Sequence, residues 1–165
     1  MTRSPTPETL LTELPFVHVL PDEYAILERD GVLMANLQAS IGICIYDAVF
    51  EPGALLHLKA LPDKSVEIEL TDVVLAGDLL LLEQALAALR ASAPRAQYWQ
   101  GKILTHCPPH DPALSAIAQS VAKFAADWLA DAGVQIVDRQ MLAGRRARVQ
   151  FRPQMGQLRT ASIHV

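Results

Sequence analysis

Residues 41–61 read IGICIYDAVFEPGALLHLKAL, with two apolar runs on either side of Glu51-Pro52-Gly53. The first run covers 41–47 and the second covers 54–61. Pro and Gly favour a turn, and short apolar runs on both sides of a turn are typical of paired β-strands. The stretch therefore predicts a β-hairpin that reverses direction near residues 48–53.

Further strands and two helices are expected around this hairpin. Asp30-Gly31 separates two earlier apolar runs and predicts another tight hairpin, because Gly readily takes the positive φ of such turns. The longest helical patterns cover about 72–90 and 112–132. Asp111 precedes Pro112 as the expected N-cap of the second helix, and Gly133 is expected to end it. The remaining strand candidates are 16–20, 24–28, 32–37, 66–70, 97–104, 134–141, 146–151 and 157–165.

This order of elements predicts a single α+β domain. Mostly antiparallel or mixed β-sheets would carry the two helices on their faces. A length of 165 residues fits one domain, and the hydrophobic content of 51% excludes a disordered chain. We expect residues 1–15 to form a flexible N-terminal arm and residues 16–165 to form the domain.

Charge and composition restrict the partners and the compartment. The formal net charge is -4, which gives no overall attraction to nucleic acid or to anionic lipid. The apolar runs are interrupted well before the ~20 residues that a membrane span requires. The chain has two cysteines and no secretory signal pattern at its N-terminus. These observations predict a cytoplasmic protein without nucleic-acid or membrane partners.

Two groups of residues in this sequence have the side chains that catalysis or metal binding uses. Cys44 and His57 lie on the two strands of the predicted hairpin, and a Cys beside a His can form a thiolate nucleophile. The alternative interpretation is that both belong to the core. His106, Cys107 and His110 lie within five residues and suggest a metal site, although two prolines restrict this loop. Its alternative interpretation is an ordered turn before the second helix.

The last part of the chain is basic. Alternation along a strand would place the polar residues of 146–152 on one face and the apolar ones on the other. This pattern is typical of a solvated edge strand, which we favour over a binding surface. The polar residues are Arg146, Arg148, Gln150 and Arg152.

The hairpin stretch and the basic ending together resemble the chemoreceptor glutamine deamidases, the CheD family. Members carry the run T-x-G-x-G-S-C-V-x-V-x-hydrophobic-x-D, then a short turn and G-x-x-x-H. Here 41–47 and Gly53-Ala54-Leu55-Leu56-His57 are similar to these motifs. The family's ending G-G-x-x-A-R-x-V-x-F with a T-G hairpin is similar to residues 143–151 followed by Met155-Gly156. The resemblance extends over about 16–160 and implies a CheD-like layered sandwich.

The resemblance also implies a catalytic triad that this sequence has changed. The family uses a Cys nucleophile, a His base and a Thr that orients the His. Counting back from Asp47 puts the nucleophile position at Ser40 and the Thr position at Met34, whereas His57 keeps its identity. Cys44 lies four residues beyond Ser40, about 13 Å farther along a strand.

These matches and departures imply a cytoplasmic chemotaxis protein with impaired or lost deamidase catalysis and a retained binding role. Its partners would be chemoreceptor cytoplasmic regions and chemotaxis adaptor or phosphatase proteins, and no cofactor is expected. One alternative is an active glutamine deamidase that uses Cys44 or Ser40 with His57. An alternative from another class is a metal-binding protein that uses His106, Cys107 and His110.

Overall fold

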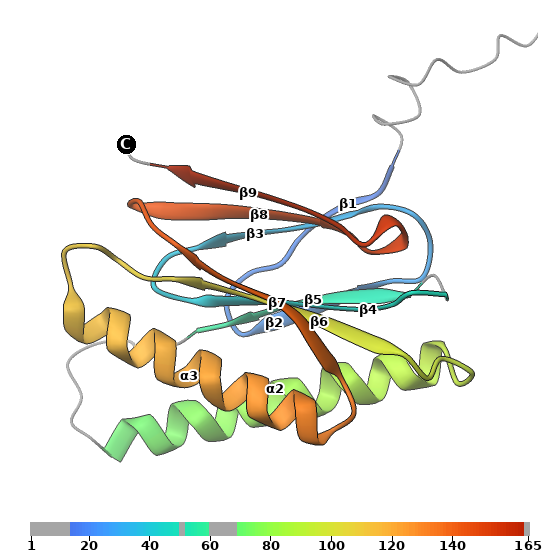
Figure 1. The fold of residues 1–165 in the computed structure, drawn as a ribbon, viewed down its shortest axis with the longest axis horizontal. Helices are drawn as coiled ribbons and strands as arrows, with labels where there is room; N and C mark the ends of the chain where they lie inside the picture. Colours follow the sequence, from blue (N-terminus) through green and yellow to red (C-terminus); the bar gives the residue numbers. More distant parts are fainter. Residues whose placement is uncertain (1–13, 50–51, 60–68, 164–165) are drawn as a thin grey trace, which may run out of the picture.

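The computed structural model describes residues 14–49, 52–59 and 69–163 (Figure 1). These residues form one α+β domain with three layers: an outer sheet, a middle sheet and two helices. The outer sheet has the order β1-β3-β8-β9, and the middle sheet has the order β2-β5-β4-β6-β7. The predicted fold class is therefore confirmed. The strands are β1 (Phe16–His18), β2 (Glu23–Leu27), β3 (Val32–Leu37), β4 (Ile41–Asp47), β5 (Gly53–Leu58), β6 (Trp99–His106), β7 (Gln135–Leu142), β8 (Arg146–Arg152) and β9 (Gln157–Ile163).

Both helices cover the same face of the middle sheet (Figure 1). They are α2 (Glu69–Ser92) and α3 (Pro112–Asp131), and a short 3-10 helix η1 (Pro153–Met155) joins β8 to β9. The Asp111 carboxylate caps α3 by accepting from the Leu114 N–H at 3.0 Å. Gly133 follows α3 with φ 93°. The cap and the ending of this helix are thus confirmed.

The two sheets are mixed. β1 pairs with β3 in parallel, and β6 pairs with β7 in parallel across the connection through α3. The other strand pairs are antiparallel, including the predicted hairpin of β4 and β5. In this hairpin Gly42 lies opposite His57 and Cys44 lies opposite Leu55.

Two apolar cores fill the spaces between the layers. The core between the helices and the middle sheet contains alternate residues of β4, and an alanine-rich face of α3 packs closely over it. The core between the two sheets contains the opposite residues of β4, among them Cys44. β4 is therefore buried on both faces, which explains its continuous apolar run.

The predicted hairpin at Asp30-Gly31 is wrong. The strands on either side of it, β2 and β3, belong to different sheets, and Gly31 does not have a positive φ. Gly31 is required for another reason, because a Cβ there would lie 2.9 Å from the Pro15 carbonyl oxygen. Asp30 forms a bidentate ion pair with Arg152, with contacts of 2.8 Å and 2.5 Å.

Two further sequence predictions fall partly on residues that the structure does not describe. Of the strand predicted at 66–70, residues 66–68 lie outside the described residues, while Glu69 and Leu70 belong to α2. Most of the predicted N-terminal arm, 1–13, also lies outside them. No helix in the described part of the chain is long and apolar enough to cross a membrane.

Candidate functional site

Ser40 and His57 meet at one end of the space between the two sheets. Ser40 immediately precedes β4, and His57 is near the end of β5. The Ser40 Oγ and the His57 Nε2 are 2.8 Å apart. Both residues are buried, with 3% and 1% of their surface exposed.

The backbone determines which ring nitrogen of His57 carries the proton. The His57 Nδ1 lies 3.1 Å from the carbonyl oxygen of Val19. A carbonyl oxygen only accepts hydrogen bonds, so Nδ1 must carry the hydrogen. Nε2 is then free of hydrogen and accepts from the Ser40 hydroxyl. This is the tautomer that a general base needs beside a hydroxyl nucleophile.

The Val19 carbonyl stands where the family resemblance implied a Thr side chain. The corresponding sequence position is Met34, whose thioether cannot orient the ring in the way a hydroxyl does. Val19 nevertheless depends on Met34, because the Val19 N–H donates to the Met34 carbonyl at 2.7 Å. This bond extends the β1–β3 pairing and holds the Val19 carbonyl beside the His57 Nδ1. Val19 was not among the residues predicted from the sequence, since a backbone acceptor has no residue signature.

Burial changes the chemistry of His57. It lowers the pKa of His57 below its ordinary value of 6.5, although the bond to Val19 acts in the opposite direction. The ring is therefore neutral at pH 7. It can accept a proton, but the buried imidazolium that results is poorly stabilised because its Nδ1 partner is an uncharged carbonyl.

Cys44 does not join this pair. It lies in the core between the sheets, fully buried, and pairs across the sheet with Leu55 and Lys102. Burial raises the pKa of the Cys44 thiol, although the charge of Lys102 acts against that shift. Cys44 therefore stays a protonated thiol. The constellation of Cys44 with His57 is not formed, because Gly42 rather than Cys44 occupies the position opposite His57.

The turn that carries Ser40 is held by a second buried histidine. The His106 Nδ1 accepts from the Ala39 N–H at 2.7 Å, and its Nε2–H donates to the Gly144 carbonyl at 2.8 Å. The His106 N–H also donates to the Ser40 carbonyl at 3.0 Å. Ala39 has φ 49°, a left-handed conformation that is unfavourable for a residue with a Cβ. His106 thus stabilises a strained turn directly before the candidate nucleophile.

This arrangement leaves the predicted metal site without its first ligand. Both ring nitrogens of His106 already have backbone partners, so binding a metal would break at least one of these bonds. Cys107 is half-buried and accepts from the Gln119 amide at 3.9 Å, whereas His110 is exposed. In the described residues no group of three His, Cys, Asp or Glu side chains is placed to hold a metal ion.

A cavity adjoins the same end of the sandwich. It has a volume of about 560 Å³ and is bordered by the residues before α3 and by the β7–β8 connection. Gly144 links it to the candidate site, because this residue lines the cavity and accepts from His106. The lining residues are Pro108, Pro109, His110, Asp111, Gly144 and Arg145.

Comparisons with known proteins do not assign a family. No protein-family model matches the chain, and the comparison with curated proteins finds no match. Among solved structures, the chain is similar to the crystal structure of Neisseria meningitidis protein NMB0706, described as DUF152. The TM-score is 0.44 at 10% sequence identity, and the match covers 82% of this chain and 70% of that chain. A similarity this distant carries no functional argument.

Proposed function

We propose that this chain is a CheD-like chemotaxis protein that binds glutamine-bearing regions of chemoreceptors and hydrolyses their side-chain amides slowly at most. The observation that carries the proposal is the buried hydrogen bond between the Ser40 Oγ and the His57 Nε2. It joins the two positions to which the family resemblance assigns the nucleophile and the base. The adjoining cavity provides a recess at the same end of the fold.

The reaction that this pair supports is amide hydrolysis in two steps. In the first step, the Ser40 Oγ bonds to the amide carbon while its proton moves to the His57 Nε2. That proton then passes to the leaving nitrogen, the C–N bond breaks, and ammonia departs. In the second step, water attacks the resulting ester and gives its proton to the same ring, which returns it to Ser40 as glutamate is released.

Two features of the site make this reaction slow. A hydroxyl holds its proton more tightly than a thiol, so it depends more strongly on its base. That base is His57, whose pKa is lowered by burial. The Val19 carbonyl orients the ring but carries no charge, so it stabilises the imidazolium that forms during the reaction less than the carboxylate of a Ser-His-Asp triad does. We therefore expect binding to be retained and turnover to be strongly reduced.

A second candidate, an active serine amidohydrolase, is favoured by one observation. The His57 tautomer set by Val19 is already the one that a working base requires. Under this candidate the wild-type protein would turn over at the ~1 to 10³ s⁻¹ common among enzymes.

Deamidation of a purified chemoreceptor cytoplasmic fragment tests both candidates. Ammonia release and the Gln-to-Glu mass change would be measured for the wild type, Ser40→Ala, Ser40→Cys and Cys44→Ala. We expect the wild type to bind the fragment and to turn over close to the Ser40→Ala background. Ser40→Cys should gain ~10²-fold or more in rate, because it restores a thiol beside the retained base.

Cys44→Ala is the matched control, because this thiol is buried away from His57. The Cys44→Ala variant should leave both binding and turnover unchanged. Ordinary enzyme rates in the wild type would favour the second candidate. Both candidate functions would be contradicted if the receptor fragment does not bind to the protein and if Ser40→Cys does not deamidate it.

A further inference from the structure

Positive charge is concentrated at the C-terminal end of this acidic chain. Residues 139–165 contain six Arg and no Asp or Glu. The first 138 residues contain all 18 acidic residues and only eight Lys or Arg. Since β8 and β9 lie in this last segment, the outer sheet receives most of the positive charge.

The strand register gathers four of these six arginines on the outer face of the outer sheet, which neither α2 nor α3 covers (Figure 1). They are Arg146, Arg148, Arg152 and Arg159, whereas Arg139 lies in β7 of the middle sheet and Arg145 lies in the β7–β8 connection. The β8 burial pattern alternates, with Ala147, Val149 and Phe151 buried beneath and the polar residues outside, as the sequence pattern predicts. The predicted edge position is wrong, because β8 pairs with β3 on one side and with β9 on the other. Across β9, Gln150 lies opposite Arg159, and Arg152 lies opposite Gln157. The outward residues of β8 and β9 are Arg146, Arg148, Gln150, Arg152, Gln157, Arg159, Ala161 and Ile163.

The β1–β3 half of this face is more apolar. Phe16 is 55% exposed and lies beside Val32, and the partly exposed Met34 lies two residues farther along β3, beside His18. The face therefore presents an apolar half next to a basic half. No Asp or Glu lies in β1, β3, β8 or β9, so the face has no acidic side chain of its own strands.

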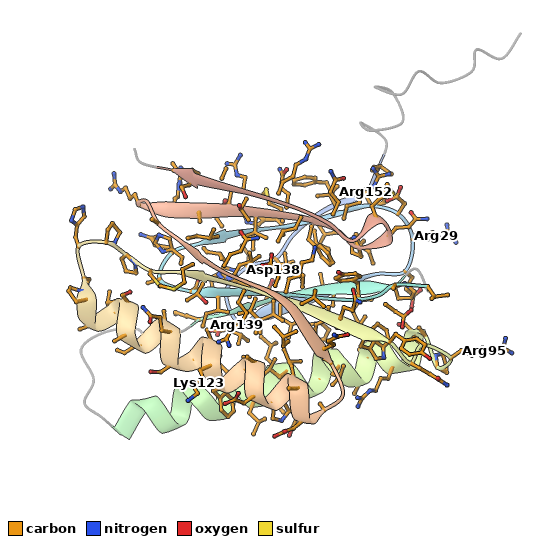
Figure 2. The ribbon with its side chains drawn as sticks, in the orientation of Figure 1. Arg29, Arg95, Lys123, Asp138, Arg139 and Arg152 are labelled. Carbon is orange, nitrogen blue, oxygen red and sulfur yellow. The ribbon has the colours of Figure 1, made fainter. Side chains whose placement is uncertain are left out.

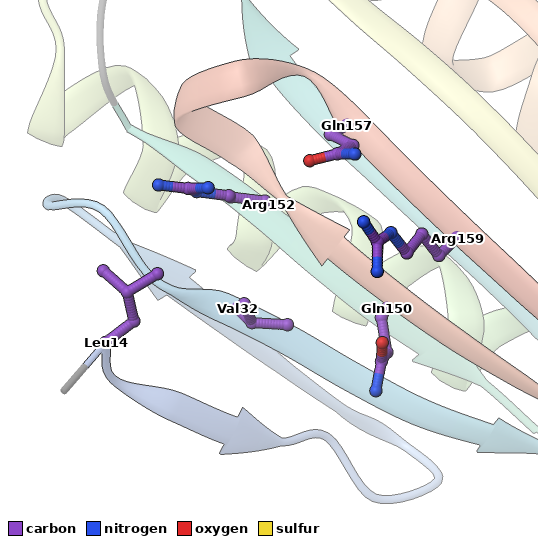
Figure 3. A pocket seen from close by; sticks show the side chains of 6 residues that line it. All are labelled: Leu14, Val32, Gln150, Arg152, Gln157 and Arg159. Atoms are coloured by element: carbon purple, nitrogen blue, oxygen red, sulfur yellow. The ribbon is translucent and has the colours of Figure 1, made fainter. Parts of the chain in front are cut away.

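A hollow lies at the boundary between the two halves (Figure 3). It has a volume of about 170 Å³, which is below the ~300 to 1,000 Å³ of sites for drug-sized ligands and suits one side chain. Leu14 and Val32 form its apolar side, and the remaining lining groups can donate hydrogen bonds. These donors are Gln150, Arg152, Gln157 and Arg159.

The arginines of this face differ in their availability. Arg152 is fixed by its ion pair with Asp30, and the Arg148 Nε lies 3.5 Å from the Asn36 amide oxygen. Among the residues that the structure describes, Arg146 and Arg159 pair with no carboxylate. These two exposed guanidinium groups can therefore bind a carboxylate from another molecule without losing an internal partner.

We propose that the outer face of the β1-β3-β8-β9 sheet is a docking surface for an acidic, partly apolar segment of a partner protein. Carboxylates of that segment bind Arg146 and Arg159, and its apolar side chains cover Phe16, Val32 and Met34. This surface is separate from the Ser40–His57 pair and does not depend on its activity.

Charge complementarity favours an acidic protein segment over nucleic acid. The other parts of the chain are acidic and repel a phosphate backbone that extends beyond the sheet. The apolar half of the face is also unsuited to phosphates, whereas a peptide offers apolar and acidic side chains together. Interfaces of this kind use Arg and aromatic side chains as anchors.

Fluorescence anisotropy with a labelled peptide in which Glu alternates with Leu tests the proposal. The full chain would be compared with the double variant Arg146→Glu/Arg159→Glu. The control Arg95→Glu/Lys123→Glu makes the same change in net charge at two exposed residues. Figure 2 shows Arg95 and Lys123 in the lower part of the molecule, on the side of the helices and away from Arg152. Circular dichroism would verify that all proteins are folded.

We expect the wild type and the control to bind the peptide equally, and the double variant to bind ~10-fold or more weakly. Binding should also weaken as salt rises from ~0.05 M to ~0.3 M, because exposed charges are screened. An equal loss of peptide affinity in the control would refute the docking surface, since the net charge of the protein would then explain binding. Tighter binding of a labelled oligothymidylate than of the peptide would refute the partner class, and absence of peptide binding would refute both.

Discussion

Replacing His106 by Phe tests whether this buried ring holds the turn that carries Ser40. Phe preserves an aromatic ring at a position with 0% exposure but removes both nitrogen atoms. The Ala39 N–H then loses its acceptor, and the Gly144 carbonyl loses its donor. Both groups are backbone atoms in the interior, so water cannot easily replace the lost partners.

The size of the effect follows from these two bonds. Leaving one buried polar group without a partner costs ~1 to 3 kcal/mol, so the variant should lose about 4 kcal/mol of unfolding free energy. For a chain of this size, ~2 to 4 °C of Tm corresponds to each kcal/mol, which predicts a decrease of about 10 °C. His106→Asn should lose about half as much, because its side-chain oxygen can still accept from the Ala39 N–H.

Urea unfolding and thermal melts of the wild type, His106→Phe, His106→Asn and His110→Asn would measure these differences. His110 is exposed next to the same loop, so its replacement is the control and should change stability by less than ~0.5 kcal/mol. Equal stability of His106→Phe and the wild type would show that the two backbone bonds do not hold this turn. A loss in His106→Asn as large as in His106→Phe would show that the Ala39 bond contributes nothing.

Gly53→Ala should lower the free energy of unfolding in urea by ~1 to 3 kcal/mol, because its Cβ would lie 2.3 Å from the Pro153 Cβ. Gly77→Ala should raise the free energy of unfolding by ~0.5 to 1 kcal/mol, because its Cβ in α2 would have nothing within 4 Å. The opposite order of the two variants would refute the packing argument. Burial lowers the pKa of His57 from 6.5, so the unfolded chain binds the proton more tightly and stability should fall as pH drops below 6.5. His57→Gln should remove this fall in unfolding free energy below pH 6.5, as measured by urea titrations at several pH values. An unchanged pH dependence in the variant would contradict the assignment to His57. Burial raises the pKa of Asp78 to about 7, so the folded chain retains a proton that the unfolded chain loses above pH 3.8, and stability should fall as pH rises towards 7. Asp78→Asn should therefore gain stability relative to the wild type between pH 5 and pH 8, by about 1 kcal/mol or more, and a constant difference would refute this.

The sequence predicts the features of the fold that depend on neighbouring residues. The Pro-Gly turn at 52–53 and the apolar runs beside it predict the β4–β5 hairpin, and Asp111-Pro112 predicts the start of α3. In each case the responsible side chains act within a few residues of their own position. The alternation in 146–152 likewise predicts which face of β8 is buried.

Features that depend on distant pairing are not predictable in this way. The Asp30-Gly31 dipeptide has the composition of a hairpin turn, but β2 pairs with β5 and β3 pairs with β1 and β8. Which strands pair depends on how apolar residues are buried across the whole sandwich. A short stretch of sequence does not contain this information. The same applies to His106, which looks like a metal ligand beside Cys107 until the contacts with Ala39 and Gly144 are known.

The candidate site was predicted only in part, for the same reason. Counting from Asp47 leads to Ser40 as the neighbour of His57, and the structure places these two side chains together. The strain at Ala39 and the acceptor at Val19 have no counterpart in residue type. The strain at Ala39 and the position of the Val19 carbonyl both depend on the backbone conformation of the folded chain.

The use of a main-chain oxygen to orient His57 has a consequence for how this site tolerates mutation. No substitution at position 19 removes the carbonyl itself, and residue 34 contributes to the site only through its main-chain carbonyl oxygen. Both positions can therefore change identity over evolution without loss of the ring's orientation, provided that β1 stays paired with β3. Selection would have to preserve the backbone conformation at these positions rather than the residue types. Related sequences can therefore differ at positions 19 and 34 and still share the same site.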